Sequence, residues 1–324
     1  MDGSSLLETD GRPVMHQMPR RQARLRQWAA TASVSVALAL ILAKLAAWWI
    51  TDSVAMFGSM LDSGLDLAAS SLTFLAIRTA ILPPDANHRF GHGKAEALAS
   101  LGQAAVMAGT ATFLLFESLQ RLADPVPIVH AQVALYVSVF AICVTAALIL
   151  FQKWVIGQTG SIAIHSDSRH YRGDLFLNLA VIAAIQAILL GAPLWIDPLF
   201  GLGVAAYIGW ECYRAAAPAV DVLMDTEFSR AERERIFNLV LGNDAVRGLH
   251  DLKTRNAGSR RFIQMHVELD GRMSLKQAHM VATELEATVG EVFDNTEILI
   301  HMDPVGLELA HLTLDELKLG SHRA

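Results

Sequence analysis

Cysteine is almost absent from this sequence, since Cys143 and Cys212 are the only two among 324 residues. Both lie inside apolar runs, so neither a disulfide framework nor a CxxC metal site can be built from them. We expect two small thiols in apolar surroundings.

Charge is scarce as well. Charged residues make up 18% of the chain and hydrophobic residues 53%, and the mean hydropathy is +0.36. This balance is too apolar for a soluble domain of this length and is typical of a polytopic membrane protein with a soluble part. Basic residues are not in excess, because the net charge is −6, which argues against a nucleic-acid binder. The polar start of the chain lacks the pattern of a secretory signal peptide.

Six apolar stretches are each long enough to cross a bilayer as a helix. They lie near 29–50, 54–78, 95–121, 130–154, 165–190 and 196–218. Connections on one side contain almost no basic residue apart from Arg121, whereas the other side is rich in arginine and lysine. The positive-inside rule therefore predicts that both termini are cytoplasmic.

After Pro218 the pattern becomes that of a small soluble domain. An amphipathic helix is followed by a hairpin of two alternating strands, a second helix and a third strand. The order αββαβ predicts an α+β domain with its helices on one sheet face. We expect four segments: a disordered cytoplasmic tail at 1–27, a transmembrane domain at 28–218, a cytoplasmic metal-binding domain at 219–305 and a C-terminal tail at 306–324.

The second apolar stretch carries two acidic residues near its middle, Asp62 and Asp66. A spacing of four puts both carboxylates on one helix face. An aspartate at the centre of a membrane helix costs roughly 2.5–3.5 kcal/mol, so this face cannot look at lipid. It must face a cation, a proton path or a buried partner.

The fifth stretch carries a matching pair, His170 and Asp174, and Asn178 continues the same face. With the two aspartates of the second stretch, this pair supplies three carboxylates and one imidazole. Such a set can close a tetrahedral site for Zn²⁺ or a similar divalent ion. His170 lies near the predicted cytoplasmic end, so the fifth helix has to start earlier or tilt.

Two further clusters lie outside the apolar stretches. In the loop after the second stretch, Asp85, His88 and His92 are spaced so that they can hold one metal, although a polar loop with incidental histidines remains an alternative. The soluble domain carries metal-ligand types at or near the ends of its elements: His250, His266, His279, His301 and Asp303. Imidazoles with a bridging carboxylate suit Zn²⁺, whereas any one of these histidines alone would be read as a surface residue.

Several motifs resemble the cation diffusion facilitator family. They are DSGLD, NHRFGHGKAEALA and HYRGD in the apolar part, and GLHDLKTR, RFIQMHVELD, QAHMVA and ILIHMDP in the soluble part. The resemblance covers about residues 25–305 and is closest to the bacterial zinc and ferrous-iron efflux proteins of that family. Met302 departs from the pattern, which has a glutamine at this place.

The resemblance implies a homodimer in the bacterial inner membrane, with six-helix protomers and a ferredoxin-like, metallochaperone-like cytoplasmic domain. It implies a transporter without catalytic residues that exchanges a divalent ion for protons: Zn²⁺ first, with Fe²⁺, Cd²⁺, Co²⁺ or Mn²⁺ as alternatives. By the same resemblance Asp62, Asp66, His170 and Asp174 form the transport site, and Asp85, His88 and His92 form the loop site. His250, His266, His279, His301 and Asp303 form a two-zinc site, and Lys94 and Asp225 form a charge interlock at the dimer interface.

In this hypothesis metal and proton compete for one site. His170 is the best proton carrier, because imidazole titrates near neutral pH. Metal binding requires the neutral ring, and this competition is the physical basis of antiport. Rocking of the helices then exposes the site to the far side.

Two alternatives remain, a membrane-anchored metalloenzyme and a metal sensor. Histidine-box desaturases also join apolar helices to histidines, and the segment from His88 to His92 is formally an HxxxH box. The chain lacks further boxes such as HxxHH. Neither alternative needs Asp62 and Asp66 in the middle of a membrane helix.

Overall fold

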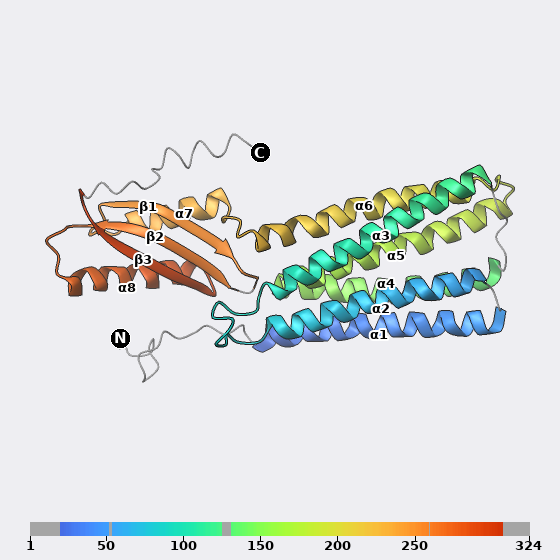
Figure 1. Cartoon of the computed structure of the whole chain (residues 1–324), viewed down its shortest axis with the longest axis horizontal. Helices are drawn as coiled ribbons and strands as arrows, with labels where there is room; N and C mark the ends of the chain where they lie inside the picture. The colour runs from blue at the N-terminus through green and yellow to red at the C-terminus, as the bar shows by residue number, and fades with distance from the viewer. Residues whose placement is uncertain (1–19, 52–53, 125–130, 259, 307–324) are drawn as a thin grey trace. The chain divides into compact units, whose positions relative to one another are not determined.

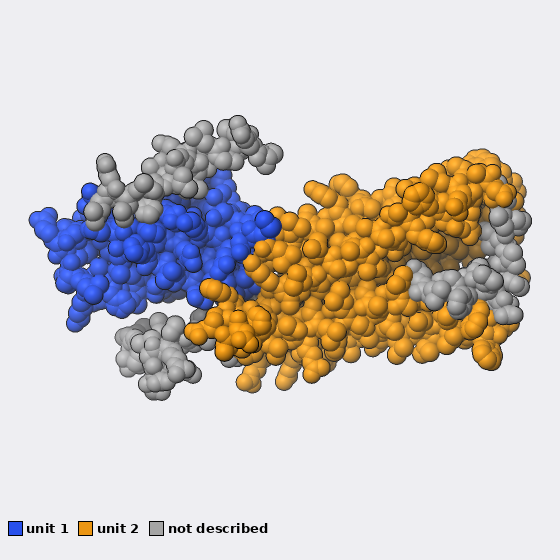
Figure 2. Space-filling view, in the orientation of Figure 1, with its two compact units in different colours: residues 1–18, 224–324 blue, residues 19–223 orange. Residues whose placement is uncertain are grey.

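The computed structural model describes residues 20–51, 54–124, 131–258 and 260–306 (Figure 1). The described residues form two compact units, which divide between Leu223 and Met224 (Figure 2). The two expected tails lie mostly outside the described residues.

The helical unit, orange in Figure 2, contains six long helices, which run side by side (Figure 1). They are α1 (Arg20–Thr51), α2 (Val54–Ala80), α3 (Ala95–Ala123), α4 (Ala131–Thr159), α5 (Ile162–Leu189) and α6 (Ile196–Leu223). The six helices predicted from the apolar stretches are confirmed. By length and hydropathy alone, four of them qualify as membrane spans within the described part of the chain: α1, α3, α4 and α5.

Several helix ends differ from the positions that hydropathy indicates; α4, for example, continues to Thr159. Helix α1 begins at Arg20, so residues 20–27, which the sequence assigns to the tail, form its first two turns. They are helical because Arg26 is buried in the bundle, where it finds a carboxylate. Helix α5 begins at Ile162, capped by Ser161, which is the earlier start that His170 required. Helix α6 continues past Pro218 to Leu223.

The helical unit exposes large apolar side chains and buries polar ones beside its apolar clusters. Large side chains such as Trp49, Phe113 and Leu150 are exposed, whereas its buried residues include serines, glutamines and charged groups. Among the described residues, the polar side chains that bond between helices gather mainly in the first half of α5 and the segments packed against it. This distribution suits a lipid-facing exterior around a functional interior.

The α+β unit, blue in Figure 2, has the predicted αββαβ order: α7 (Arg230–Leu241), β1 (Gly248–Asn256), β2 (Arg261–Leu269), α8 (Leu275–Val292) and β3 (Thr296–Pro304). The sheet order is β1-β2-β3, with β1 antiparallel and β3 parallel to β2. In this register His250 lies opposite His266, and His266 lies opposite His301. One row of the sheet therefore carries three imidazoles.

The core of this unit lies between one sheet face and both helices. Ile263, Met265 and Val267 of β2 are buried in a cluster with Ile236 of α7 and Leu285 of α8. Because strand side chains alternate, the residues between them, including His266, point to the opposite face. The histidine face is thus the one that α7 and α8 do not cover.

Candidate metal centres

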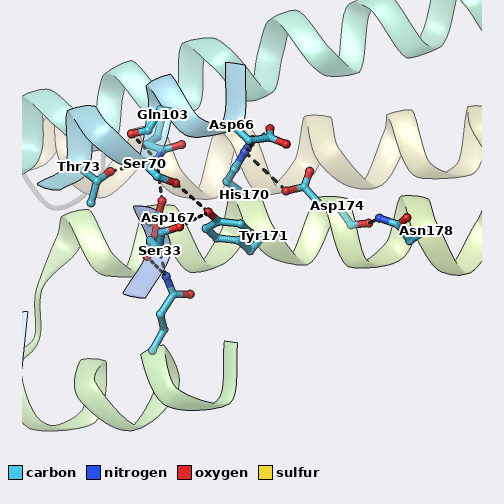
Figure 3. Close-up of polar contacts among 12 residues, drawn as sticks. Ser33, Asp66, Ser70, Thr73, Gln103, Asp167, His170, Tyr171, Asp174 and Asn178 are labelled. Atoms are coloured by element: carbon cyan, nitrogen blue, oxygen red, sulfur yellow. Dashed lines mark hydrogen bonds and ion pairs between the residues drawn. The ribbon is translucent and has the colours of Figure 1, made fainter. Parts of the chain in front are cut away.

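The structure brings together three of the four residues expected to form the transport site. His170 Nε2 lies 3.0 Å from Asp66 Oδ1 and 3.7 Å from Asp174 Oδ2 (Figure 3). Their ligand atoms all lie within 4.8 Å of one another. Asp62 lies one helical turn before Asp66 on α2, and its side chain is outside the described part of the structure.

A hydrogen-bonded network that sequence reasoning missed lies beside this cluster (Figure 3). Asp167 is buried and accepts hydrogen bonds from two carboxamides, and Tyr171 donates to the carbonyl oxygen of Ser33 at 3.0 Å. The Tyr171 hydroxyl also lies 2.9 Å from that of Ser70 on α2. The sequence did contain an indication of this network: Asp167 is a further charged residue in the fifth apolar stretch, three positions before His170.

Two buried ion pairs also join helices of this unit. Arg26 contacts Glu96 at 2.5 Å and donates to the carbonyl oxygen of Thr159 at 2.6 Å. Arg169 of α5 contacts Glu211 of α6 at 2.9 Å. Each carboxylate and each guanidinium in these pairs has lost its water and holds a partner of opposite charge.

The loop between α2 and α3 assembles the second expected cluster. Asp85 lies 3.3 Å from His88 Nδ1 through one oxygen and 3.3 Å from His92 Nε2 through the other. The backbone N–H of His88 donates to Asp85, which together with the Asn87 N–H and the two imidazoles holds the pKa of that carboxyl below its usual value. Gly91 has φ +85°, a conformation that glycine adopts freely.

The third cluster centres on Asp303, at the end of β3. Its Oδ2 accepts from His266 Nδ1 at 2.8 Å and lies 3.3 Å from His250 Nε2, while its Oδ1 lies 3.3 Å from His301 Nε2. Burial raises the pKa of Asp303, but the hydrogen bond from His266 and the nearby imidazoles outweigh this and lower it. A carboxylate with imidazoles at both oxygens can contribute one oxygen to each of two metal sites.

Two carboxylates near this third cluster were missed. Glu268 Oε1 lies 3.3 Å from His250 Nδ1, and Asp251 Oδ2 lies 3.8 Å from His266 Nε2. Asp251 lies in an irregularity between His250 and Lys253, with φ +46°. Its adjacency to His250 was visible in the sequence, but the backbone distortion was not.

The remaining expected residues lie apart from these clusters. His279 is exposed on α8, and among the described residues it is not part of the group formed by His250, His266 and Asp303. Met302 packs against the core of its unit. Lys94 precedes α3, and Asp225 contacts Arg255 at 3.5 Å; because they belong to different units, their interlock stays a prediction.

Comparison with known proteins accounts for both units. The family model described as the cation efflux transmembrane domain matches residues 30–224. The model described as the cytoplasmic domain of cation efflux proteins matches residues 228–305.

Individual relatives match almost the whole chain. The cation-efflux pump FieF of Shewanella oneidensis is 44% identical over 280 residues, which is 86% of this chain and 94% of the relative. FieF of Salmonella arizonae is 39% identical over 289 residues, which is 89% of this chain and 95% of the relative. One similar solved structure is the metal-bound C-terminal domain of the CzcD transporter from Thermotoga maritima. The match includes 100% of that structure and 25% of this chain, with 28% sequence identity and a TM-score of 0.24.

Proposed function

Because this chain belongs to the cation diffusion facilitator family, we propose that it exports divalent metal ions by exchanging them for protons at Asp62, Asp66, His170 and Asp174. The chain is a multi-pass membrane transporter for cation efflux, so the metalloenzyme and sensor alternatives are set aside. The proton exchange and the four ligands are the proposal.

The contact between His170 and Asp66 across two helices carries this proposal. A buried imidazole between two carboxylates is a stable place for either a proton or a metal ion. When the ring is neutral, its nitrogen can bind a metal; when a proton occupies that nitrogen, the metal is released. A proton gradient across the membrane would therefore drive metal release on the far side.

We propose Zn²⁺ as the principal ion. One imidazole with carboxylates fits zinc at tetrahedral geometry, and the same donors also accept Fe²⁺, Cd²⁺, Co²⁺ or Mn²⁺. The family and the charge pattern favour a bacterial inner membrane with both termini on the cytoplasmic side.

The cytoplasmic unit fits resident zinc. Asp303 with His250, His266 and His301 offers imidazoles around a bridging carboxylate on the sheet face that the helices leave free. The loop residues Asp85, His88 and His92 offer a smaller set of the same kind. Zinc bound at these two clusters would neutralise the negative charge of the clustered carboxylates. It would remain bound to the protein and would not be the transported ion.

We also propose a homodimer, because the family model that matches residues 228–305 bears the name ZT_dimer, which refers to a dimer. Exposed His279 is then available to the Asp303 cluster of a second copy. Lys94 and Asp225 form the interlock between the membrane and cytoplasmic units at that interface.

The test is metal uptake into proteoliposomes that contain a pH-sensitive dye. Asp66→Ala should abolish metal-driven proton movement, because the remaining ligands cannot close the site, while the cytoplasmic unit keeps its zinc. His250→Ala should do the reverse, lowering bound zinc and leaving residual transport. Asp221→Ala removes an exposed carboxylate of α6 and should leave both readings unchanged. Full transport by Asp66→Ala would contradict the assignment.

A further inference from the structure

Asp167 is a buried carboxylate inside the membrane unit that the proposed exchange does not use. Its Oδ1 accepts from Gln103 Nε2 of α3 at 2.9 Å (Figure 3). Its Oδ2 accepts from Gln152 Nε2 of α4 at 2.7 Å. Asp167 and both glutamines are 1% exposed or less. The group therefore lies at the junction of three helices, away from bulk water.

Its partners set it apart from the other buried carboxylates among the described residues of this unit. Glu96 faces Arg26, Glu211 faces Arg169, and Asp66 faces His170. The hydrogen bonds to Asp167 come from neutral groups, two amides and the Ser33 hydroxyl, whereas the imidazole of His170, which also faces it, is hydrogen-bonded to Asp66. An ionised carboxylate without a cationic partner is expensive in a membrane interior, so binding a proton there relieves a cost that the other three do not carry.

The two glutamines can form hydrogen bonds with Asp167 whether its carboxyl group is ionised or protonated. Both amide groups point nitrogen towards the carboxylate, and both Oε1 atoms are buried without a hydrogen-bond partner in the described structure. A half-turn of an amide exchanges its oxygen and nitrogen, which would offer an acceptor to a protonated carboxyl group.

The remaining contacts indicate which glutamine turns. Gln103 Nε2 also donates towards the carbonyl oxygen of Ala69 at 3.2 Å and Thr73 Oγ1 at 3.0 Å, and these contacts hold it in place. Gln152 Nε2 has Ser33 Oγ as its other partner, at 3.0 Å. The Ser33 hydroxyl also donates its proton to the carbonyl oxygen of Ala29 at 3.0 Å. Because a hydroxyl can rotate, Gln152 can turn and keep its contact with Ser33 if that proton moves from Ala29 to the glutamine oxygen.

The titratable groups that face Asp167 are both on its own helix: His170 and Tyr171. The other helices present neutral groups to this network: Ser33 from α1, Ser70 and Thr73 from α2, Gln103 from α3 and Gln152 from α4. Residues three apart on a helix are neighbours, so the charge at Asp167 acts on the transport site at short range.

We propose that Asp167 is a second proton-binding residue of the transport cycle, protonated when the transport site is free of metal. The inference rests on the proposed exchange. One proton on the imidazole of His170 and one on the carboxyl of Asp167 carry the same charge as one divalent ion. Both protons would enter from the far side as the metal leaves, and both would pass to the cytoplasm when the next ion binds. The buried groups then keep the same net charge in both states, which a low-dielectric interior favours.

The experiment compares Asp167→Asn with the unaltered protein in proteoliposomes, recording metal and proton fluxes together. The asparagine keeps the shape of the site and cannot exchange a proton, so the proton-to-metal ratio should fall by about one. Transport should also become sensitive to an imposed membrane voltage, because charge now moves with each ion. Thr73→Val, an isosteric change in the same network, should keep the original ratio.

Infrared difference spectra provide a readout that is independent of flux. Adding Zn²⁺ to the unaltered protein should remove a protonated-carboxyl band, and this loss should be missing in Asp167→Asn and present in Thr73→Val. An unchanged ratio with an unchanged spectrum would make Asp167 a structural hydrogen-bond acceptor and overturn the proposal. If the unaltered protein moved no protons, the proposed exchange itself would fail, and this proposal with it.

A second variant keeps the test valid if the asparagine protein does not fold. Gln152→Leu removes one donor from the carboxylate, so Asp167 should hold its proton to higher pH. The pH optimum of metal export should therefore move upward. An optimum at the original pH would overturn the proposal.

Discussion

At the scale of single residues, the membrane unit depends on buried charges that are each matched to one partner. Arg26 and Glu96 are both almost fully buried, and Ser161 Oγ donates to the second oxygen of Glu96 at 2.6 Å. Such a pair adds little net stability over an apolar pair of the same size, but removing one member leaves the other charged and unpaired. The arrangement therefore fixes where α1, α3 and the start of α5 meet.

Arg26→Met should destabilise the protein by about 3–5 kcal/mol, because Glu96 would remain buried without its cation. Thermal unfolding in detergent measures this loss. Adding Glu96→Gln to the same variant should recover much of it, since no bare charge is then left. Arg24→Met, which removes an exposed arginine two positions earlier, is the matched control and should unfold like the unaltered protein. A normal unfolding temperature for Arg26→Met alone would contradict the argument.

The sequence correctly predicted which residues lie close together where the spacing along one helix places two side chains on the same face. The spacing of four between His170 and Asp174 predicts a shared face, and two such pairs predict a site. It could not reach the partners of Asp167, because Gln103 lies 64 residues away in the chain and only packing brings them together. Asp251 was missed because a local strand irregularity, rather than strand alternation, places it beside His266.

At the scale of elements, both helices of the cytoplasmic unit begin with a capping box, but the third helical residue, which completes the box, is charged in one helix and neutral in the other. Ser229 and Glu232 form a capping box at α7, and Ser274 and Gln277 form one at α8. Burial raises the pKa of Glu232, but hydrogen bonds from Ser229 and Arg261 outweigh it and hold the pKa below its ordinary value. The start of α7 is therefore stabilised by a charge, whereas the start of α8 is not.

The first turn of α7 should lose protection in acid, and that of α8 should not. A carboxyl group whose pKa is lowered by folding stabilises the fold above its unfolded pKa of about 4.3 and loses this contribution as pH falls through the lower folded value. Hydrogen-exchange protection of the two helix starts, compared between about pH 6 and about pH 3, measures the difference.

Glu232→Gln converts the first capping box into the form of the second. The pH dependence at α7 should then disappear, while Ser274 and Gln277 at α8 provide an internal control within the same molecule. Equal acid sensitivity of both helix starts in the unaltered protein would show that the carboxylate is not responsible.

Helix ends were the least predictable feature of the elements. Hydropathy places the start of the first helix at residue 29, because the arginines before it read as a polar tail. The helix extends to Arg20 because Arg26 finds Glu96 and the carbonyl oxygen of Thr159 inside the bundle. The order of these elements along the chain and the hairpin of β1 and β2, in contrast, followed directly from alternation and turn residues.

At the scale of the whole molecule, the ligands proposed for transport and those proposed for cytoplasmic metal binding lie in separate units. The cluster around Asp303 lies on the sheet face that α7 and α8 leave uncovered, and the imidazole of His301 is largely exposed there. A second copy can therefore reach this face. His279, exposed on α8, is the remaining imidazole that the sequence assigns to this site.

We predict that His279→Ala weakens zinc-dependent association of two copies and reduces the zinc bound per chain, while His250, His266 and Asp303 still hold one ion. The reason is that a metal ion shared between copies contributes its binding free energy to association only when both supply ligands. Zinc content by elemental analysis, and sedimentation of the full-length protein in detergent with and without a chelator, measure the two effects. Lys276→Ala, one turn earlier on α8 and also exposed, should change neither. If His279→Ala kept its full zinc content and still dissociated on chelation, the second copy would be joined through other residues of the Asp303 cluster.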